Sequence, residues 1–151
     1  MKIHLAAILA LGAAGCASGP PEPVAIDTLN DQCAACRMVI SDPAFAAQIV
    51  APGEEPRLYD DLRCLRDGLA AAPPARGARI FVADRRTGAW VAAGAAVYAR
   101  VPDLATPMAS HWAAYADVAS LRADPYAAAS VRVAVSEVLG GEAAGAPARN
   151  R

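Results

Sequence analysis

Four leucines at helical spacing occupy the middle of the chain and constrain its fold more than any other feature. Leu58, Leu62, Leu65 and Leu69 recur at intervals of 4, 3 and 4 residues, so they would line one face of a helix over residues 57–72. Two aspartates near the start of this segment suit a helix N-terminus. Turns containing Pro and Gly bound the segment on both sides, so the helix should stand between other short elements.

The segments around this helix have the patterns of short strands. Residues 44–51 alternate and are compatible with a strand, as are residues 96–101. Residues 79–93 predict two strands around a turn at residues 85–88, and residues 105–116 predict a loop followed by a strand. A helix set among short strands indicates a mixed fold rather than a bundle.

A faint internal repeat extends this interpretation. Met38 precedes a strand-like run that leads into the first helix, which starts near an aspartate. Met108 likewise precedes a strand-like run, and a second aspartate-started helix follows over residues 117–129, whereas residues 130–140 fit either a helix or a strand. The sequence therefore predicts an α+β fold, a small single domain of two related strand–helix halves.

The N-terminus has the pattern of a secretory signal. Lys2 precedes an apolar run over residues 5–14, which is too short to span a bilayer and has the length of a signal-peptide core. The run leads into LGAAGC, which looks like a bacterial lipoprotein signal, so residues 1–15 would be removed and Cys16 lipidated. This predicts a periplasmic protein anchored to a membrane, with the outer membrane favoured. Ordinary cleavage nearby, which would release a soluble periplasmic protein, is the alternative.

Composition divides the rest of the chain. Residues 16–31 are rich in Pro and small residues and lack periodicity, which predicts a lipidated, flexible tether. Residues 32–140 suit one compact domain. Residues 141–151 predict a disordered tail.

Charge and motifs argue against several classes of function. The formal net charge is −1 and no basic stripe is present, so nucleic-acid binding is not expected. No Gly-rich loop suggests a nucleotide. A hydrolase built from Cys33, His111 and Asp60 or Asp61 would lack a nucleophile signature around its cysteine.

The stretch DQCAACRMVI contains a Cys-x-x-Cys pair, Cys33 and Cys36. Arg37 stands where haem attachment requires His, which excludes that use. A thioredoxin-like dithiol normally opens a helix directly after a strand, and no helix is predicted here. A redox dithiol, a structural disulfide in the oxidising periplasm, and a Cys3His zinc site with Cys64 and His111 stay open as alternatives.

The methionines favour a fourth use of the pair. Beyond the predicted signal the chain has two methionines, Met38 and Met108, and one histidine, His111. Met38 lies two residues after the cysteine pair, and Met108 lies in TPMASH, three residues before the histidine. Cu(I) prefers thiolate and thioether sulfur and accepts imidazole, so the pattern favours a Cu(I) site. The alternative for each methionine is ordinary core packing.

Four collinear blocks carry a resemblance to a known family: DQCAACRMVISDPAFAAQIV, LYDDLRCL, VADRRTGAW and TPM. In this order they resemble the NosL family, lipoprotein accessory proteins of nitrous oxide reductase. The resemblance covers about residues 31–120, most of the predicted domain. Its most specific part is the Cys-x-x-Cys-x-Met followed by ISDP.

The resemblance implies a periplasmic, membrane-tethered copper(I) chaperone and not an enzyme. Its expected role is delivery of copper for the copper–sulfur centre of nitrous oxide reductase. The implied partners are the apo form of that reductase and its membrane ABC-type maturation complex. By position, the implied copper ligands are Cys33, Cys36, Met38 and Met108. His111 and Cys64 are further candidates, with a half-buried free thiol as the alternative for Cys64.

The chain departs from the family pattern at two places. Arg37 stands where the family commonly has Gly, and ASHW follows TPM where a Gly-rich stretch is common. A cation at Arg37 is expected to lower the pKa of the neighbouring thiols.

Overall fold

The structure, a computed structural model, describes residues 19–141 and contains two small sheets with helices between their strands. The elements are η1 (Pro43–Phe45), β1 (Ala47–Val50), β2 (Arg57–Tyr59), α1 (Leu62–Ala71), β3 (Arg79–Ala83), β4 (Trp90–Ala92), β5 (Val97–Arg100), β6 (Trp112–Tyr115), α2 (Val118–Ala123), η2 (Pro125–Ala129), β7 (Val131–Val133) and α3 (Val135–Leu139).

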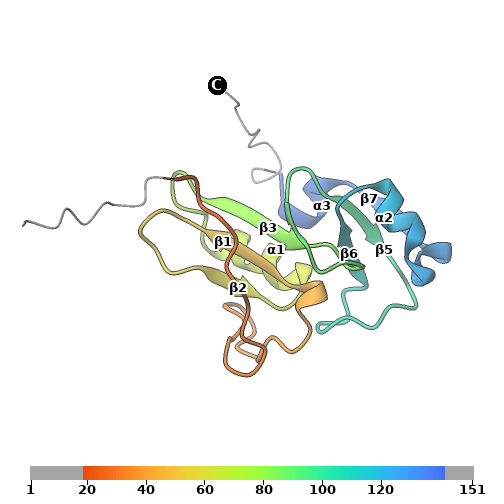
Figure 1. Ribbon diagram of the computed structural model, residues 1–151, viewed down its shortest axis with the longest axis horizontal. Coiled ribbons are helices and arrows are strands. Elements are labelled where there is room, and N and C mark those ends of the chain that lie inside the picture. The colour runs from red at the N-terminus through yellow and green to blue at the C-terminus, as the bar shows by residue number, and fades with distance from the viewer. Residues whose placement is uncertain (1–18, 142–151) are drawn as a thin grey trace, which may run out of the picture.

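Both sheets are antiparallel and share one connectivity. The first has the strand order β2-β1-β3-β4, and the second has the order β6-β5-β7. In each, a hairpin is followed by a helix and then by a strand that returns beside the first strand of the hairpin. The sheets lie side by side (Figure 1). This arrangement confirms the α+β class and the two related strand–helix halves.

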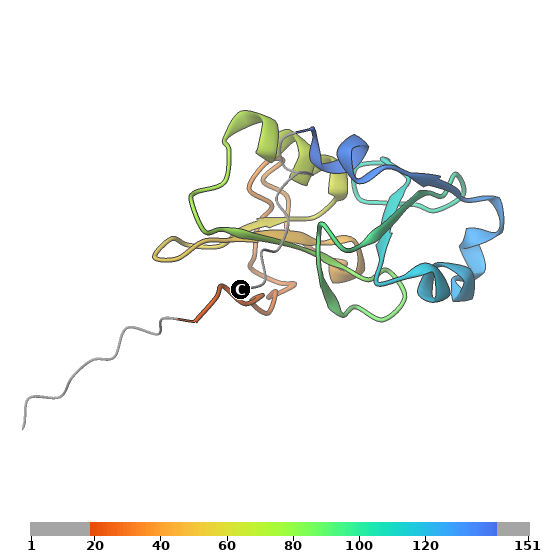
Figure 2. The same cartoon turned by 90° about the horizontal axis from the view of Figure 1, so that it is seen from above.

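The helix α1 supplies much of the core between the halves. Leu62, Leu65 and Leu69 are buried and join a cluster that includes residues of β1, β2 and β3. α1 also contacts α3 and β6, and Figure 2 shows α1 and α3 on the same face of the first sheet. A smaller core in the second half includes Tyr115 and Leu121. Burial of these aliphatic and aromatic side chains makes the main favourable contribution to the stability of the fold.

The predicted helix over residues 57–72 starts several residues before the helix in the structure. Residues Arg57–Tyr59 form the strand β2, and α1 begins at Leu62 after the N-cap Asp61. Leu58 has helical spacing from Leu62, but it pairs with Gln48 of β1. A four-residue interval alone does not distinguish the end of a strand from the first turn of a helix. The region 130–140, left open between helix and strand, contains both β7 and α3.

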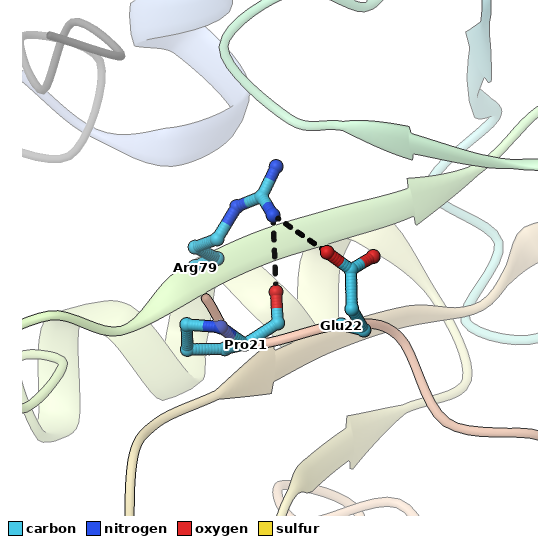
Figure 3. Close-up of polar contacts among 3 residues, drawn as sticks. All are labelled: Pro21, Glu22 and Arg79. Carbon is cyan, nitrogen blue, oxygen red and sulfur yellow. Dashed lines mark hydrogen bonds and ion pairs between the residues drawn. The ribbon is translucent and has the colours of Figure 1, made fainter. Parts of the chain in front are cut away.

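The segment before the cysteine pair packs on the first sheet. The Val24 N–H donates to Oε1 of the buried Gln48 at 2.8 Å, and Gln48 Nε2 donates to the Val24 carbonyl at 3.1 Å. Arg79 Nη1 donates to the Pro21 carbonyl at 3.1 Å and pairs with Glu22 at 3.4 Å (Figure 3). Figure 2 shows this segment on the face of the sheet opposite α1. This part of the predicted tether is therefore attached to the domain.

The predicted signal over residues 1–15, the lipidated Cys16 and residues 142–151 of the predicted tail lie outside the described residues. Within residues 19–141, no helix is both long enough and apolar enough to cross a membrane.

Candidate metal centre

The cysteine pair lies in a tight hairpin turn. Gln32 bridges to Val39, the Cys33 N–H donates to the Met38 carbonyl at 2.8 Å, and the Arg37 N–H donates to the Cys33 carbonyl at 3.0 Å. Arg37 has φ of 67°, the left-handed conformation that favours glycine. No helix follows the pair, which agrees with the sequence prediction and differs from a thioredoxin-like arrangement.

The start of α1 lies against this hairpin. The Ala34 N–H donates to the Leu58 carbonyl of β2 at 2.7 Å, which fixes the turn beside the end of that strand. β2 leads directly into Asp60 and the N-cap Asp61, whose Oδ1 accepts from the Arg63 N–H at 2.7 Å. Cys64 then lies in the first turn of α1. Two segments separated by about 25 residues thus deliver their side chains to one place.

Three thiols and one carboxylate converge there. One ligand atom from each of Cys33, Cys36, Asp60 and Cys64 lies within 4.8 Å of the others. Cys33, Asp60 and Cys64 are buried, whereas Cys36 is half-buried. The Cys36 thiol donates to Asp60 Oδ2 at 3.3 Å, and Asp60 Oδ1 is buried without a hydrogen-bond partner. A buried carboxylate oxygen with no donor is costly unless a cation or proton occupies the space beside it.

Burial dominates the electrostatics of the thiols. It raises the pKa of the Cys36 thiol, and contacts with Cys33 and Asp60 act in the same direction against the opposing Met38 N–H. Burial likewise raises the pKa of Cys64, and the nearby Asp60 and Cys33 add to this effect. The expectation that Arg37 lowers the pKa of these thiols is wrong for Cys36, because loss of solvation outweighs a cation on an exposed side chain.

Met38 belongs to the hairpin through its backbone, and its side chain lies at the surface. The side chain is 48% exposed, beside the exposed Val39. The methionine therefore belongs to the turn that carries Cys33 and Cys36 and exposes its side chain to solvent.

Met108 and His111 belong to a loop that is attached to the start of α1. The Met108 N–H donates to Asp61 Oδ2 at 3.1 Å, and the half-buried Met108 side chain packs against the core cluster that includes Cys33 and Cys64. His111 does not join the four converging residues. Its Nδ1 lies 3.0 Å from the Leu104 carbonyl, which can only accept, so Nδ1 carries the proton and Nε2 is the nitrogen able to bind a metal.

Sequence reasoning did not single out Asp60 as a site residue. The signal was the doublet of Asp60 and Asp61 at the start of α1, because one aspartate suffices to cap a helix. Asp61 is the cap, and the spare carboxylate points to the thiols. Cys64, whose alternative was a half-buried free thiol, is fully buried in the same group.

A set of three thiols and one carboxylate suits a thiophilic metal ion, because thiolates bind Cu(I) and Zn²⁺ in preference to hard cations. No protein-family model matches this chain, and no curated protein or solved structure matches it either.

Proposed function

We propose that this protein is a copper(I) chaperone that carries one Cu(I) at Cys33, Cys36 and Cys64 and passes it to a partner. The observation that carries the proposal is the convergence of three thiols within 4.8 Å, two of them buried, with one at the surface. Buried thiolates hold a soft ion away from water and oxidants. The half-buried Cys36 offers the side from which another protein's ligands can enter.

Transfer would then be ligand exchange, without an enzymatic step on a substrate. A partner thiolate or imidazole displaces Cys36 first, since this is the most accessible of the three sulfurs. The exposed Met38 beside it offers a neutral thioether that can hold Cu(I) weakly while ligands change. Met108 packs against the core cluster that includes Cys33 and Cys64 and is a further thioether ligand of the proposal, and His111 Nε2 is a further candidate on the same loop.

Features of the sequence support the proposed partners and location. The four blocks that resemble the NosL family point to apo nitrous oxide reductase as the recipient of copper, through its membrane ABC-type maturation complex. The lipoprotein-like start of the chain points to the periplasm, with Cys16 as the lipid attachment site. A lipid anchor would keep the carrier at high local concentration near a membrane-bound partner.

Anaerobic titration of the reduced protein with Cu(I) against a chromophoric chelator tests the proposal. The wild type should compete for one Cu(I), and Cys64→Ser should weaken binding by tenfold or more. Met38→Ala should weaken it less, and Val39→Ala, which removes an equally exposed neighbour, should leave it unchanged. Copper affinity should fall as the pH is lowered, because the thiols must release protons to bind the ion. Wild-type affinity that survives Cys64→Ser would refute the three-thiol site.

A zinc site is a second candidate, favoured by Asp60. Three cysteines and a carboxylate make a four-ligand set that Zn²⁺ can bind, because this ion accepts both Cys sulfur and Asp oxygen in four-coordinate sites. Competition of Cu(I) and Zn²⁺ for the same protein separates the two uses. Asp60→Ala should abolish tight Zn²⁺ binding while leaving three sulfurs for Cu(I).

A thiol–disulfide protein using Cys33 and Cys36 is the remaining alternative. Reactive dithiols have a lowered pKa, whereas burial raises the pKa of Cys36 and leaves Cys33 inaccessible. An insulin-reduction assay distinguishes it: activity that is lost in Cys33→Ser and indifferent to Met38→Ala would favour the redox protein.

A further inference from the structure

The Cys33 hairpin has a counterpart in the hairpin of β3 and β4, which precedes β5 as the Cys33 hairpin precedes β1. Between β3 and β4 the Asp84 N–H donates to the Ala89 carbonyl at 2.8 Å, and the Gly88 N–H donates to the Asp84 carbonyl at 2.8 Å. The first hairpin has the same two bonds at the same spacing, at Cys33 and Arg37. The left-handed residue also recurs, since φ is 70° at Gly88 and 67° at Arg37.

The flanking bridges and strand contacts repeat as well. The pair Ala83 and Trp90 closes the second hairpin as Gln32 and Val39 close the first. The Arg85 N–H donates to the Ala114 carbonyl of β6 at 2.8 Å, as Ala34 donates to Leu58 of β2.

The strand and helix that follow keep the same register. Tyr59 of β2 pairs with Ala47 of β1, and Tyr115 of β6 pairs with Val97 of β5. Two residues beyond each tyrosine, an aspartate caps the following helix. The backbone that carries the candidate metal centre is therefore present twice, and each ligand position has an equivalent. The equivalents of Cys33, Cys36, Asp60 and Cys64 are Asp84, Thr87, Ala116 and Ser120, respectively.

Among these four equivalent residues, the Asp84 carboxylate accepts hydrogen bonds that join the hairpin to the start of α2. Asp84 is fully buried, and its Oδ1 accepts from the N–H groups of Arg86 and Thr87 at 2.9 Å each. Its Oδ2 accepts from the Ala116 N–H at 2.7 Å, so it links the hairpin to the start of α2. The Thr87 hydroxyl accepts from the Ala89 N–H at 3.3 Å, and Cys36 accepts in the same way from Met38.

We infer that the β3–β4 hairpin and the start of α2 form a second ligand-binding frame, in which the Asp84 carboxylate occupies the place that a thiophilic metal ion takes in the first frame, at the Cys33 hairpin and the start of α1. The inference rests on the proposed metal binding of the first frame. It follows that the backbone arranges the ligands, and that replacing the four side chains should convert the second frame into a metal site.

The test transfers the four ligands to the second frame of the full chain. The variant Asp84→Cys, Thr87→Cys, Ala116→Asp, Ser120→Cys is titrated anaerobically with Co²⁺, whose thiolate charge-transfer absorption counts sulfur-bound ions. The wild type should bind one Co²⁺ and the variant two. In a matched control, Ala119→Cys replaces Ser120→Cys. Because Ala119 is exposed, this control should bind one Co²⁺. A folded variant, judged by circular dichroism, that binds one ion overturns the inference.

The reverse exchange keeps the inference testable if the first variant does not fold. Cys33→Asp, Cys36→Thr, Asp60→Ala, Cys64→Ser gives the first frame the side chains of the second. It should bind no Co²⁺ and unfold at a urea concentration no lower than the metal-free wild type. A markedly lower midpoint refutes equivalence of the frames. Failure of the wild type to bind any Co²⁺ or Cu(I) refutes the proposed function instead, and the reverse variant still decides the equivalence.

Discussion

Asp60→Ala is expected to make the metal-free protein more stable, although it replaces a buried hydrogen-bonding residue. Asp60 Oδ1 is buried without a partner, a condition that costs about 1–3 kcal/mol. The substitution also removes the bond from the Cys36 thiol, a loss of about 0.5–1.5 kcal/mol. The difference predicts a gain of about 1 kcal/mol in the free energy of unfolding.

The adjacent Asp61 provides the matched control, because it is equally buried and fully bonded. Asp61→Ala removes the N-cap bond to Arg63, worth about 0.5–2 kcal/mol. It also leaves the Met108 N–H without its acceptor, at a cost of about 1–3 kcal/mol. The two contributions together predict a loss of about 1.5–5 kcal/mol. Neighbouring Asp→Ala substitutions should thus change stability in opposite directions.

Anaerobic urea unfolding with and without metal measures both effects. At a free metal concentration 100 times the Kd, the wild type should gain about 2.7 kcal/mol. A tenfold loss of affinity in Asp60→Ala would halve this gain to about 1.4 kcal/mol. Asp61→Ala should keep the full metal-dependent gain on its lower baseline. A metal-free Asp60→Ala protein that is less stable than the wild type would show that the orphan oxygen is satisfied in solution and would refute this reasoning.

Three further predictions concern Asp84, Arg37 and Gly68. Burial alone would raise the pKa of Asp84, but interactions with the Ala116 and Thr87 N–H groups and with the Ser120 and Thr87 hydroxyls prevail and lower the pKa to about 2 from 3.8. The ionised Asp84 should therefore add about 2 kcal/mol to the free energy of unfolding above pH 3.8, and this contribution should be lost as the pH falls to 2. The urea midpoint of Asp84→Asn should accordingly depend less on pH in this acid range than that of the wild type. Arg37→Gly should relieve the left-handed strain and stabilise by about 0.5–1 kcal/mol in the same unfolding assay, whereas Arg86→Gly should not stabilise. Gly68→Ala should lower the thermal midpoint and cost about 1–3 kcal/mol, because the added Cβ would lie 2.5 Å from the Tyr59 ring; an unchanged midpoint would contradict this packing.

The class of fold was predictable from local patterns, and the boundary of α1 was not. Leucine spacing found the buried face of α1 correctly at Leu62, Leu65 and Leu69. The same spacing extended to Leu58 because period 4 is compatible with both a helix and alternation in a strand. What decides the matter is the pairing of β2 with β1, a contact between residues distant in the sequence that no local window contains.

Only the N-terminal part of the candidate site could be predicted from a local sequence pattern. The Cys33 and Cys36 pair is a local signal, whereas Cys64 and Asp60 join it through the antiparallel pairing that places the end of β2 beside the hairpin. The Asp60–Asp61 doublet was visible in the sequence, but the capping role of one residue and the spare carboxylate of the other required the geometry of the helix start. The roles of Met38, Met108 and His111 as ligands stay predictions.

The comparison of the two frames explains why the candidate metal centre lies at the first of them. One backbone frame occurs twice, with one buried aspartate in each. Both oxygens of Asp84 are hydrogen-bonded, so the second frame is stable by itself. Asp60 has an unpartnered oxygen beside three thiols, an arrangement that lowers stability and that sequences retain where a bound group compensates for it. Asp84→Ala should therefore destabilise the metal-free protein where Asp60→Ala stabilises it, although both remove a buried carboxylate from the same frame.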